Sequence, residues 1–306
     1  TCAQRLLTDP ADTGVYGYDN ARKHVPPDVV VFATSHREVQ DIVRLCHEHG
    51  VPVVARGRGT ATTGAAVPVR AGVVLSLERM NRILSVDPAN RAIVVEPGVT
   101  NQAVQEAVAA HGFFWPPDPT SAAFCTVGGN LAVNAAGPHA VKYGSTRENT
   151  LGLRAVTGAG EDIHTGVYTT KGAVGYDLTR LLIGSEGTLA IITEATLKLT
   201  PLPQARRLMQ AVYASVGQAA AAIARIMAQP ATPCALEFMD AAAIEMIRSY
   251  SQADLPQAAG ALLMIEVDGP ASALDNLAAA IRTAATDSGL IRFHEARTRE
   301  EADALW

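Results

Sequence analysis

The sequence contains few cysteines, few charged residues and no excess of positive charge. Its 306 residues include four cysteines, none of them in a C-x-x-C arrangement. This spacing excludes a zinc finger, an iron–sulfur run and a dense disulfide scaffold, and it favours a reducing cytoplasm as the location. The 25 Lys and Arg residues against 30 Asp and Glu residues give a net charge of −5. Such a chain presents no basic field, so nucleic acid is not expected as a partner.

Long apolar runs and targeting signals are also lacking. The most apolar stretches, 258–267 and 216–228, fall short of the ~20 residues that a membrane-spanning helix needs. No charged-then-apolar signal pattern follows Thr1. The chain begins without Met, and it stops about two turns after a capping box at Thr298–Glu301. We therefore expect a fragment that is cut at both ends.

The remaining pattern predicts two α+β domains. Hydrophobic residues make up 48% of the chain, which excludes a largely disordered protein. We expect a first domain over 1–203 and an incomplete second domain over 204–306, a small sandwich with one sheet face covered. A capping box at Ser35–Glu38 opens a helix that Gly50 ends. Short apolar runs predict strands at 51–55, 73–77, 83–86, 92–96, 153–157, 189–199, 234–239 and 261–267.

One long segment inside the first domain has no helical or strand periodicity. From Trp115 to Gly144 the chain is dominated by Gly, Pro, Asn and Ser, and strand candidates lie on both sides of it. Loops of about 30 residues inside compact domains are uncommon and are usually functional. The segment is therefore the predicted location of a bound ligand.

A Gly- and Thr-rich loop follows the strand predicted at 51–55. In the run 53–64 (VVARGRGTATTG), glycines let backbone amides approach a phosphate without interference from Cβ. A dinucleotide-binding fingerprint would need a small residue at Thr62, and a Walker A loop would need Lys at Ala65. Taken alone, the loop is either a phosphate site or an ordinary tight turn.

Two further donor-rich segments favour the phosphate site. Residues 116–121 (PPDPTS) lead into 126–130 (TVGGN), and 184–189 (GSEGTL) run into a predicted strand. Prolines fix φ, so the second segment can keep its shape without a ligand. Three such segments suit a large cofactor that has a pyrophosphate, a sugar and a planar ring system.

These three segments, in this order, resemble the FAD-linked oxidases of the vanillyl-alcohol-oxidase/PCMH superfamily. The second match extends through 134–144 (NAAGPHAVKYG), and the third also includes 175–178 (GYDL). The most similar branch is that of D-lactate dehydrogenase and the large FAD subunit of glycolate oxidase. The resemblance implies an α+β fold: a PCMH-type FAD domain in two subdomains, followed by a partial, ferredoxin-like cap domain.

The resemblance also implies which residues bind FAD. Thr60 stands where some relatives attach the flavin to a His, so the FAD is expected to be non-covalent. By this resemblance the pyrophosphate is held by Arg56, Gly57, Arg58, Gly59, Thr60, Thr63 and Gly64. The flavin and ribityl stretch is lined by Pro117, Thr120, Ser121, Gly128, Gly129, Asn134 and Gly137. The rest of the cofactor contacts Glu186, Gly187, Ile191 and Ile192.

The implied reaction is oxidation of a D-2-hydroxy acid of the D-lactate or glycolate type. Electrons then pass to a separate acceptor, which is a quinone, a cytochrome or an iron–sulfur subunit, and the protein is cytoplasmic or bound peripherally to such a membrane partner. The catalytic residues and the His-rich divalent metal motif of relatives are expected beyond residue 306. The alternatives are another reaction on the fold, such as that of alkylglycerone-phosphate synthase or a phenol oxidase, an inactive flavin-binding module, and a structural protein without flavin.

Several other polar residues receive no catalytic role. His139 and Lys142 are expected at the loop surface rather than beside the flavin. Glu266 and Asp268 share a strand face but have no evident basic partner. His47 and His49 point to different helix faces, which excludes a shared metal ion. Two further expectations concern four residues. Cys125 is expected to be buried and inert. Lys171 and Tyr176–Asp177 are expected to form either a wall beside the flavin or a packing corner.

Overall fold

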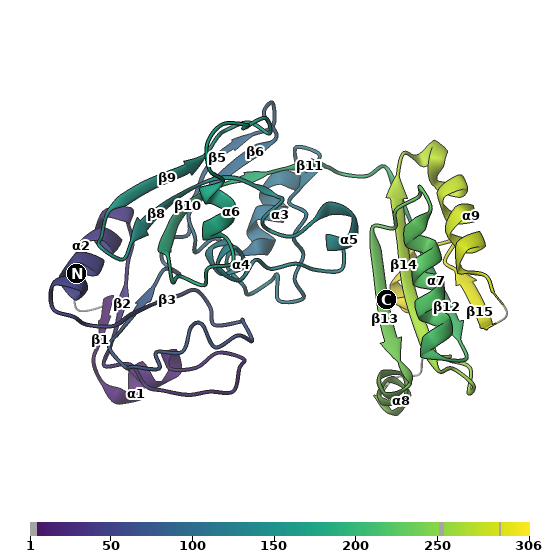
Figure 1. The fold of residues 1–306 in the computed structure, drawn as a ribbon, viewed down its shortest axis with the longest axis horizontal. Helices are drawn as coiled ribbons and strands as arrows, with labels where there is room; N and C mark the ends of the chain where they lie inside the picture. The colour runs from purple at the N-terminus through teal and green to yellow at the C-terminus, as the bar shows by residue number, and fades with distance from the viewer. Residues whose placement is uncertain (1–4, 251–253, 288) are drawn as a thin grey trace. The chain divides into compact units, whose positions relative to one another are not determined.

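The computed structural model describes residues 5–250, 254–287 and 289–306, and it divides into two compact units (Figure 1). The first unit runs up to Gly137 and again over Gly144–Leu202. The second contains Pro138–Tyr143 and everything from Pro203 onward. A short segment inside the predicted ligand loop thus belongs, by its contacts, to the second unit.

The first unit is built on two sheets. The smaller sheet has the order β1-β2-β4-β3, in which β2 and β3 are parallel to β4 and β1 is antiparallel. Its strands are β1 (Leu6–Leu7), β2 (Val29–Phe32), β3 (Val53–Arg56) and β4 (Val73–Ser76). The parallel pairing requires a crossover, which α2 (His36–Glu48) supplies between β2 and β3. Between β1 and β2 the chain forms a short helix, α1 (Pro10–Thr13), and a single 3₁₀ turn (Gly14–Tyr16).

The start of α2 illustrates how local sequence specifies these elements. Ser35 accepts the amide of Glu38, as the predicted capping box requires. The Glu38 carboxylate instead accepts the amide of Thr34 at 2.8 Å and pairs with Arg5 at 2.6 Å. The helix therefore begins where the sequence indicates, but the Glu38 carboxylate bonds to the amide of Thr34 and not to that of Ser35.

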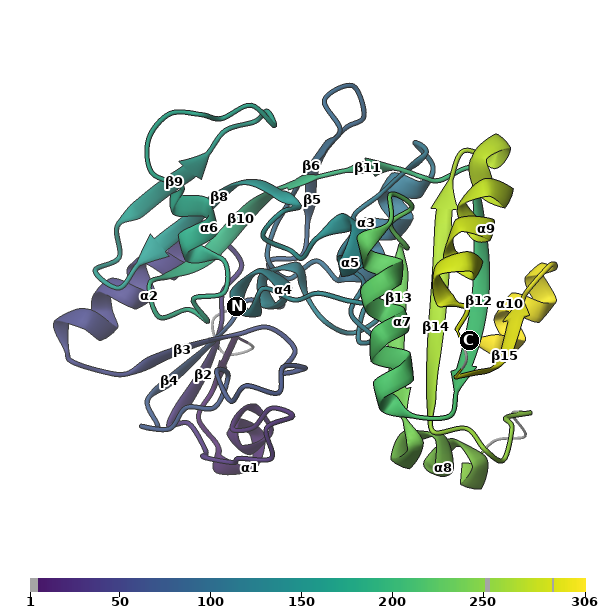
Figure 2. The ribbon, with the colours of Figure 1, turned by 45° about the vertical axis from the view of Figure 1, so that its right-hand side comes forward.

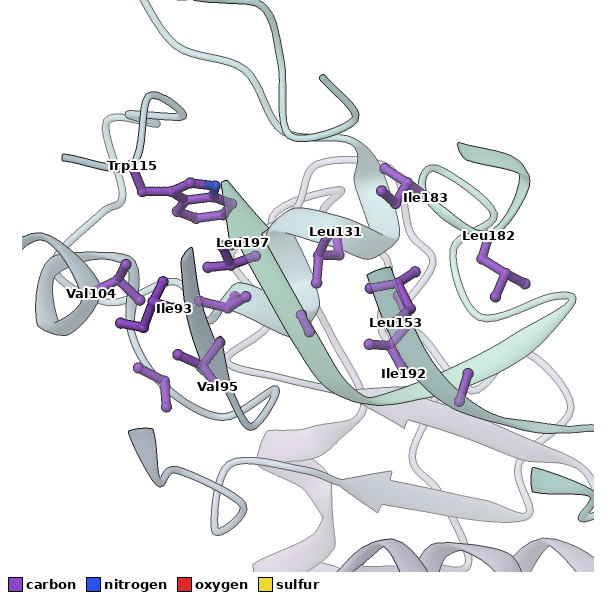
Figure 3. Packing of buried hydrophobic residues seen from close by; sticks show 14 of the residues in the cluster. Ile93, Val95, Val104, Trp115, Leu131, Leu153, Leu182, Ile183, Ile192 and Leu197 are labelled. Atoms are coloured by element: carbon purple, nitrogen blue, oxygen red, sulfur yellow. The ribbon is translucent and has the colours of Figure 1, made fainter. Parts of the chain in front are cut away.

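The larger sheet of the first unit is antiparallel, with the order β5-β6-β10-β8-β9. Its strands are β5 (Ile83–Asp87), β6 (Ala92–Val95), β8 (Thr150–Thr157), β9 (Asp162–Gly166) and β10 (Ala190–Lys198). The helices α3 (Asn101–Ala109), α4 (Val127–Val133) and α6 (Leu178–Leu182) accompany them, and β7 (Phe113–Phe114) pairs with β11 (Thr200–Pro201). Figure 3 shows the buried core, where Ile93, Leu153, Ile192 and Leu197 of the sheet meet Leu131 of α4 and Trp115.

The segment 115–144 is more regular than its composition predicts. It contains α4 and the short helix α5 (Ala140–Tyr143). Thr126 caps α4 by accepting the amide of Gly129, and Asn134 ends it in the left-handed region at φ +50°. The prediction of a structureless loop is thus wrong over these residues, because a Gly-Gly pair inside a helix conceals the helical pattern.

The second unit is a four-stranded antiparallel sheet with the order β13-β14-β12-β15. Its strands are β12 (Ala205–Tyr213), β13 (Ala235–Asp240), β14 (Ala261–Gly269) and β15 (Leu290–Glu295). Figure 2 shows α7 (Val216–Ala228) and α9 (Leu274–Ala285), which pack on one face of this sheet. The single 3₁₀ turn Ala271–Ala273 leads into α9.

The opposite face of this sheet is covered as well. Leu208, Val212 and Leu262 pack there against Ile244 of α8 (Ala241–Tyr250) and against Leu305 of α10 (Arg299–Leu305). The prediction that only one face is covered is therefore wrong. Because β14 is buried along nearly its whole length, its sequence reads as one apolar run and does not reveal which faces are covered.

Candidate functional site

The first element of the site is the loop that leaves β3. The carbonyl of Arg56 accepts the amide of Leu77, which ends the pairing of β3 with β4. In the part of the chain that the structure describes, the four following amides, from Gly57 to Thr60, donate no backbone hydrogen bond. Gly59 has φ +65°, a conformation that glycine adopts without strain. A run of unused amides of this kind is suited to an anion.

The Arg56 side chain supports the loop from within. It is only 7% exposed, its Nη1 donates to the carbonyl of Tyr18 at 2.7 Å, and its guanidinium stacks over the ring of Tyr16. Burial lowers the pKa of this guanidinium, and neighbouring Tyr16 and Asp19 oppose that effect. Besides the predicted pyrophosphate contact, Arg56 therefore has a structural role: its side chain holds the loop against Tyr16 and Tyr18.

A preceding segment braces the same loop. Asp19 is 2% exposed, and its carboxylate accepts the amide of Gly64 at 2.9 Å and that of Ala21 at 2.8 Å. Asn20 donates to the carbonyls of Thr60 and Ala61. The amide of Gly64 is therefore already occupied by protein, although the sequence predicts that it holds phosphate.

Two glycines allow close approaches of the second loop, one to the first loop and one to Pro97. A Cβ at Gly57 would stand 2.4 Å from Oγ1 of Thr126, the residue that caps α4. At Gly128, a Cβ would stand 2.6 Å from Cβ of Pro97, whose carbonyl accepts the Gly128 amide at 2.8 Å. Only glycine lets Thr126 lie so close to position 57 and Pro97 so close to position 128.

The third loop is attached to the second. The amide of Gly184 donates to the carbonyl of Leu131, and that of Glu186 donates to the carbonyl of Ala132, both at 2.9 Å. Glu186 itself adopts φ +54°, a conformation uncommon for a residue with a side chain. The three predicted segments thus lie together in one unit: backbone hydrogen bonds join the third to the second, and the Thr126 side chain of the second lies against Gly57 of the first.

Between them lies a cavity of about 380 Å³. Thirteen of the predicted binding residues line it: Arg56, Gly57, Arg58, Gly59, Thr60, Thr63, Ser121, Gly128, Gly129, Glu186, Gly187, Ile191 and Ile192. Its lining also includes residues that are not among the predicted FAD contacts: Ala55, Ala61, Thr62, Ala65, Ala66, Leu77, Pro97, Pro119, Thr126, Asn130, Ala132, Val133, Ala135 and Ala190. Most of these are small apolar residues, which carry no chemical signal in a sequence.

Five predicted residues lie outside this lining. Gly64 contacts Asp19, as described, and Thr120 is exposed. Pro117 is buried, and its carbonyl accepts from Asn101. The Asn134 amide oxygen accepts from Ser145 at 2.8 Å and from Arg147 at 3.0 Å, while a Cβ at Gly137 would stand 2.4 Å from the carbonyl of Asp118. These contacts give all five residues except Thr120 a structural task in the fold.

The lining has two chemically different regions. Unused amides and the glycines of the first loop form one of them, whereas Leu77, Ile191 and Ile192 are buried apolar side chains in another. An anionic, hydrogen-bonding group fits the first region and a flat apolar ring fits the second. The cavity therefore suits a ligand that carries both.

Comparisons with known proteins identify that ligand. The FAD binding domain matches residues 27–166, and the C-terminal domain of FAD linked oxidases matches residues 202–306. The chain belongs to the FAD-linked oxidases. FAD is the cofactor of this family's binding domain, and the predicted cofactor is confirmed. The mixed α+β, PCMH-type fold is confirmed with it.

Named relatives are similar over much of the chain. Glycolate oxidase subunit GlcD of Bacillus subtilis (strain 168) is 39% identical over 95% of this chain and 62% of its own length. The GlcD of Escherichia coli (strain K12) is 40% identical over 79% and 48%. D-Lactate dehydrogenase of Anaerostipes hadrus is 40% identical over 70% and 45%. This FAD-linked oxidase chain thus spans less than two thirds of the length of these relatives.

Solved structures share the fold. Two structures of alkyldihydroxyacetonephosphate synthase each superpose with a TM-score of 0.79, at 24% and 23% identity. The superpositions cover 98% and 99% of this chain and 64% and 60% of the two solved chains. Separately, none of the described helices is long and apolar enough to cross a membrane.

The remaining candidates from the sequence lie elsewhere. Cys125 is 2% exposed, in agreement with an inert, buried thiol. Tyr176 is 95% exposed, and Asp177 caps α6 by accepting the amide of Arg180. Lys171 is exposed, so these residues form no packed corner.

The prediction that Glu266 and Asp268 lack basic partners is wrong. Lys142 pairs with the Asp268 carboxylate, and Arg206 lies 3.4 Å from Glu266. His139, predicted at the loop surface, has a side chain only 15% exposed. All five residues belong to the second unit, where strand pairing and α5 bring them together.

Proposed function

We propose that this chain carries the FAD site of an enzyme that oxidises a D-2-hydroxy acid of the D-lactate or glycolate type to the 2-oxo acid. The observation that carries the proposal is the cavity of the first unit, with unused amides in one region and buried apolar side chains in another. Relatives named glycolate oxidase subunit, D-lactate dehydrogenase and D-2-hydroxyglutarate dehydrogenase support the substrate class, because all three names refer to 2-hydroxy acids.

Each loop has a distinct task in this proposal. The amides from Gly57 to Thr60 bind the pyrophosphate, and the close approach of Gly128 to Pro97 keeps the second loop against the cofactor. Ile191 and Ile192 exclude water from the ring. FAD held in this cavity would supply the acceptor for the hydride of the hydroxy acid. Thr60 provides no nucleophilic ring nitrogen for attachment, so the FAD is held without a covalent bond.

Electrons leave to a separate acceptor in this proposal. The cysteines that the structure describes, Cys46, Cys125 and Cys234, are buried and free, and their spacing suits no iron–sulfur cluster. The name of the GlcD relatives includes the word subunit, which is compatible with a partner protein that carries such a centre. We propose a quinone, a cytochrome or an iron–sulfur subunit as the acceptor.

The test is the visible spectrum of the purified chain with FAD, followed anaerobically while D-lactate or glycolate is added. We expect flavin bands in the purified chain, and bleaching with D-lactate or glycolate but not with L-lactate would support the proposed substrate class. Acid precipitation should release the flavin into the supernatant. Absence of flavin bands would overturn the cofactor site. Bands that persist with every 2-hydroxy acid would instead reject the oxidation of such acids by this chain and favour a module that only binds flavin.

A further inference from the structure

One face of the sheet in the second unit changes from apolar to polar along β14. Leu262 and Met264 pack in the cluster beneath α8 and α10. Side chains two residues apart share a face of a strand, so Glu266 and Asp268 continue this row. Both are nearly inaccessible: Glu266 is 6% and Asp268 is 2% exposed. Two buried carboxylates at one end of a sheet require partners, since burial of an unpaired charge is costly.

The segment 138–143 supplies partners for the outer carboxylate. Nζ of Lys142 pairs with Oδ1 of Asp268 and donates to its carbonyl at 3.1 Å. The Tyr143 hydroxyl donates to Oδ2 of the same carboxylate at 2.7 Å. Both carboxylate oxygens of Asp268 thereby have a partner in α5, and these contacts hold α5 against the polar end of the sheet.

The inner carboxylate has a different environment. Nε2 of His139 lies 3.8 Å from Oε1 of Glu266. Cys234 is completely buried, and its amide donates to the carbonyl of Glu266 at 2.7 Å. One nitrogen, one sulfur and one carboxylate oxygen of these three residues all lie within 4.8 Å of one another. Among the described residues, this is the one group of at least three such side chains that is close enough to share a metal ion.

We propose that His139, Cys234 and Glu266 form a binding site for a zinc-class divalent metal ion. Zinc binds imidazole nitrogen, thiolate and carboxylate at about 2.0–2.3 Å, so the ligand atoms of a tetrahedral site stand roughly 3.3–3.8 Å apart. The His139–Glu266 distance of 3.8 Å already matches, and the sulfur needs to approach by about 1 Å at most. A water molecule completes the four ligands.

The charges favour this assignment over a harder cation. A thiolate and a carboxylate together neutralise a divalent ion, so no net charge is buried when the metal binds. Calcium and magnesium prefer oxygen ligands, whereas a nitrogen–sulfur–oxygen set selects zinc, cobalt or iron. Nη1 of Arg206, 3.4 Å from Oε1 of Glu266, orients the carboxylate from outside.

The binding step involves no oxidation or reduction. A metal–sulfur bond forms, and the Cys234 thiol gives its proton to solvent. The ion joins the segment 138–143 to β14 and to the residue that precedes β13, which adds a restraint to those that Lys142 and Tyr143 already supply. None of the three residues lines the cavity of the first unit, and the site does not rest on the proposed reaction.

Cobalt is the probe of choice, because a cysteine thiolate bound to Co²⁺ gives a near-ultraviolet charge-transfer band that nitrogen and oxygen ligands do not. The full chain, in a Cys2→Ser background, is stripped with chelator and titrated with Co²⁺ and then with Zn²⁺. We expect one Co²⁺ per chain, the thiolate band, and loss of the band when Zn²⁺ displaces the cobalt. Cys234→Ser should abolish the band, and the matched control Cys46→Ser, which changes a buried thiol in the other unit, should keep it.

The variants His139→Gln and Glu266→Gln test independently whether these two side chains bind the metal ion. Removing an outer partner of a metal ligand lowers affinity roughly 10–100-fold, and removing a ligand should lower Co²⁺ affinity by at least that much. Failure of the unsubstituted chain to take up Co²⁺, or uptake without a thiolate band, would show that the three residues form only a hydrogen-bonded cluster. A thiolate band that survives in Cys234→Ser would equally overturn the assignment, and neither result depends on how well the other variants fold.

Discussion

The contact between Gly57 and Thr126 allows a quantitative test of how the first two loops are joined. A Cβ at Gly57 would stand 2.4 Å from Oγ1 of Thr126 but 3.6 Å from its Cβ and 3.8 Å from its Cγ2. The hydroxyl oxygen is therefore the only obstacle among the nearest atoms. Gly57→Ala should force this hydroxyl to turn away from the Gly129 amide, which costs the cap of α4. Loss of such a cap lowers the free energy of unfolding by about 1 kcal/mol.

A double-mutant cycle isolates this mechanism. Thr126→Ala removes both the obstacle and the cap, so it should also cost about 1 kcal/mol. The double variant Gly57→Ala/Thr126→Ala should then cost about 1 kcal/mol rather than 2, since the cap can be lost only once. Thermal unfolding resolves the difference, because 1 kcal/mol shifts the midpoint of a unit of this size by about 2–4 °C. The double variant should bind FAD as Thr126→Ala does.

Gly158→Ala is the matched control, because no described residue other than its two neighbours in the chain has an atom within 4 Å of a Cβ at that position. It should leave both the midpoint and FAD affinity unchanged. If the costs of Gly57→Ala and Thr126→Ala simply add, the two residues do not meet through the hydroxyl. The close approach of the first and second loops would then be refuted.

Three further predictions concern other parts of the chain. Asp19→Ala removes the acceptor of the partly buried amides of Ala21 and Gly64, so the free energy of unfolding should fall by about 1–2 kcal/mol and FAD affinity with it, as denaturant titration and flavin fluorescence will show. Gly217→Ala in α7, where a Cβ meets nothing, should raise the free energy of unfolding by roughly 0.5–1 kcal/mol. Burial raises the pKa of Tyr213 to about 12, so the folded state keeps this proton longer than the unfolded state, and stability should fall as pH rises from the ordinary tyrosine pKa towards 12. Tyr213→Phe should flatten that alkaline slope, whereas a slope identical to that of the unsubstituted chain would contradict the assignment.

Local signals in the sequence predicted much of the fold and the three loops that line the cavity. The capping residues Ser35, Ser215 and Thr298 each accept an amide three residues on, and a helix follows each of them. Capping is an interaction between near neighbours in the chain, so it can be predicted from the sequence alone. The glycine loops were visible for the same reason, since close backbone approach demands a residue type rather than a distant partner.

The brace of the first loop was missed because its members carry no such signal. Asp19 and Asn20 lie in a stretch that reads as an ordinary polar turn, yet they bond to the loop more than 35 residues further along the chain. The strand β12 was also missed, because Arg206 and Arg207 at its start interrupt the apolar pattern. Both arginines find carboxylate partners only after pairing places β14 and β15 on either side of β12.

The cluster of His139, Cys234 and Glu266 shows this limit in its clearest form. Each residue has an ordinary place in the sequence: a histidine in a loop, a cysteine before a strand, and a glutamate within an apolar run. They meet because β13 pairs with β14 beside Cys234, and because the segment 138–143 packs with the second unit although the chain on both sides of it belongs to the first. Metal-ligand spacing in a sequence reveals sites built on one hairpin or helix. A site assembled from three separate segments has no such spacing, so its ligands can be recognised only from the distances between their atoms in the folded chain.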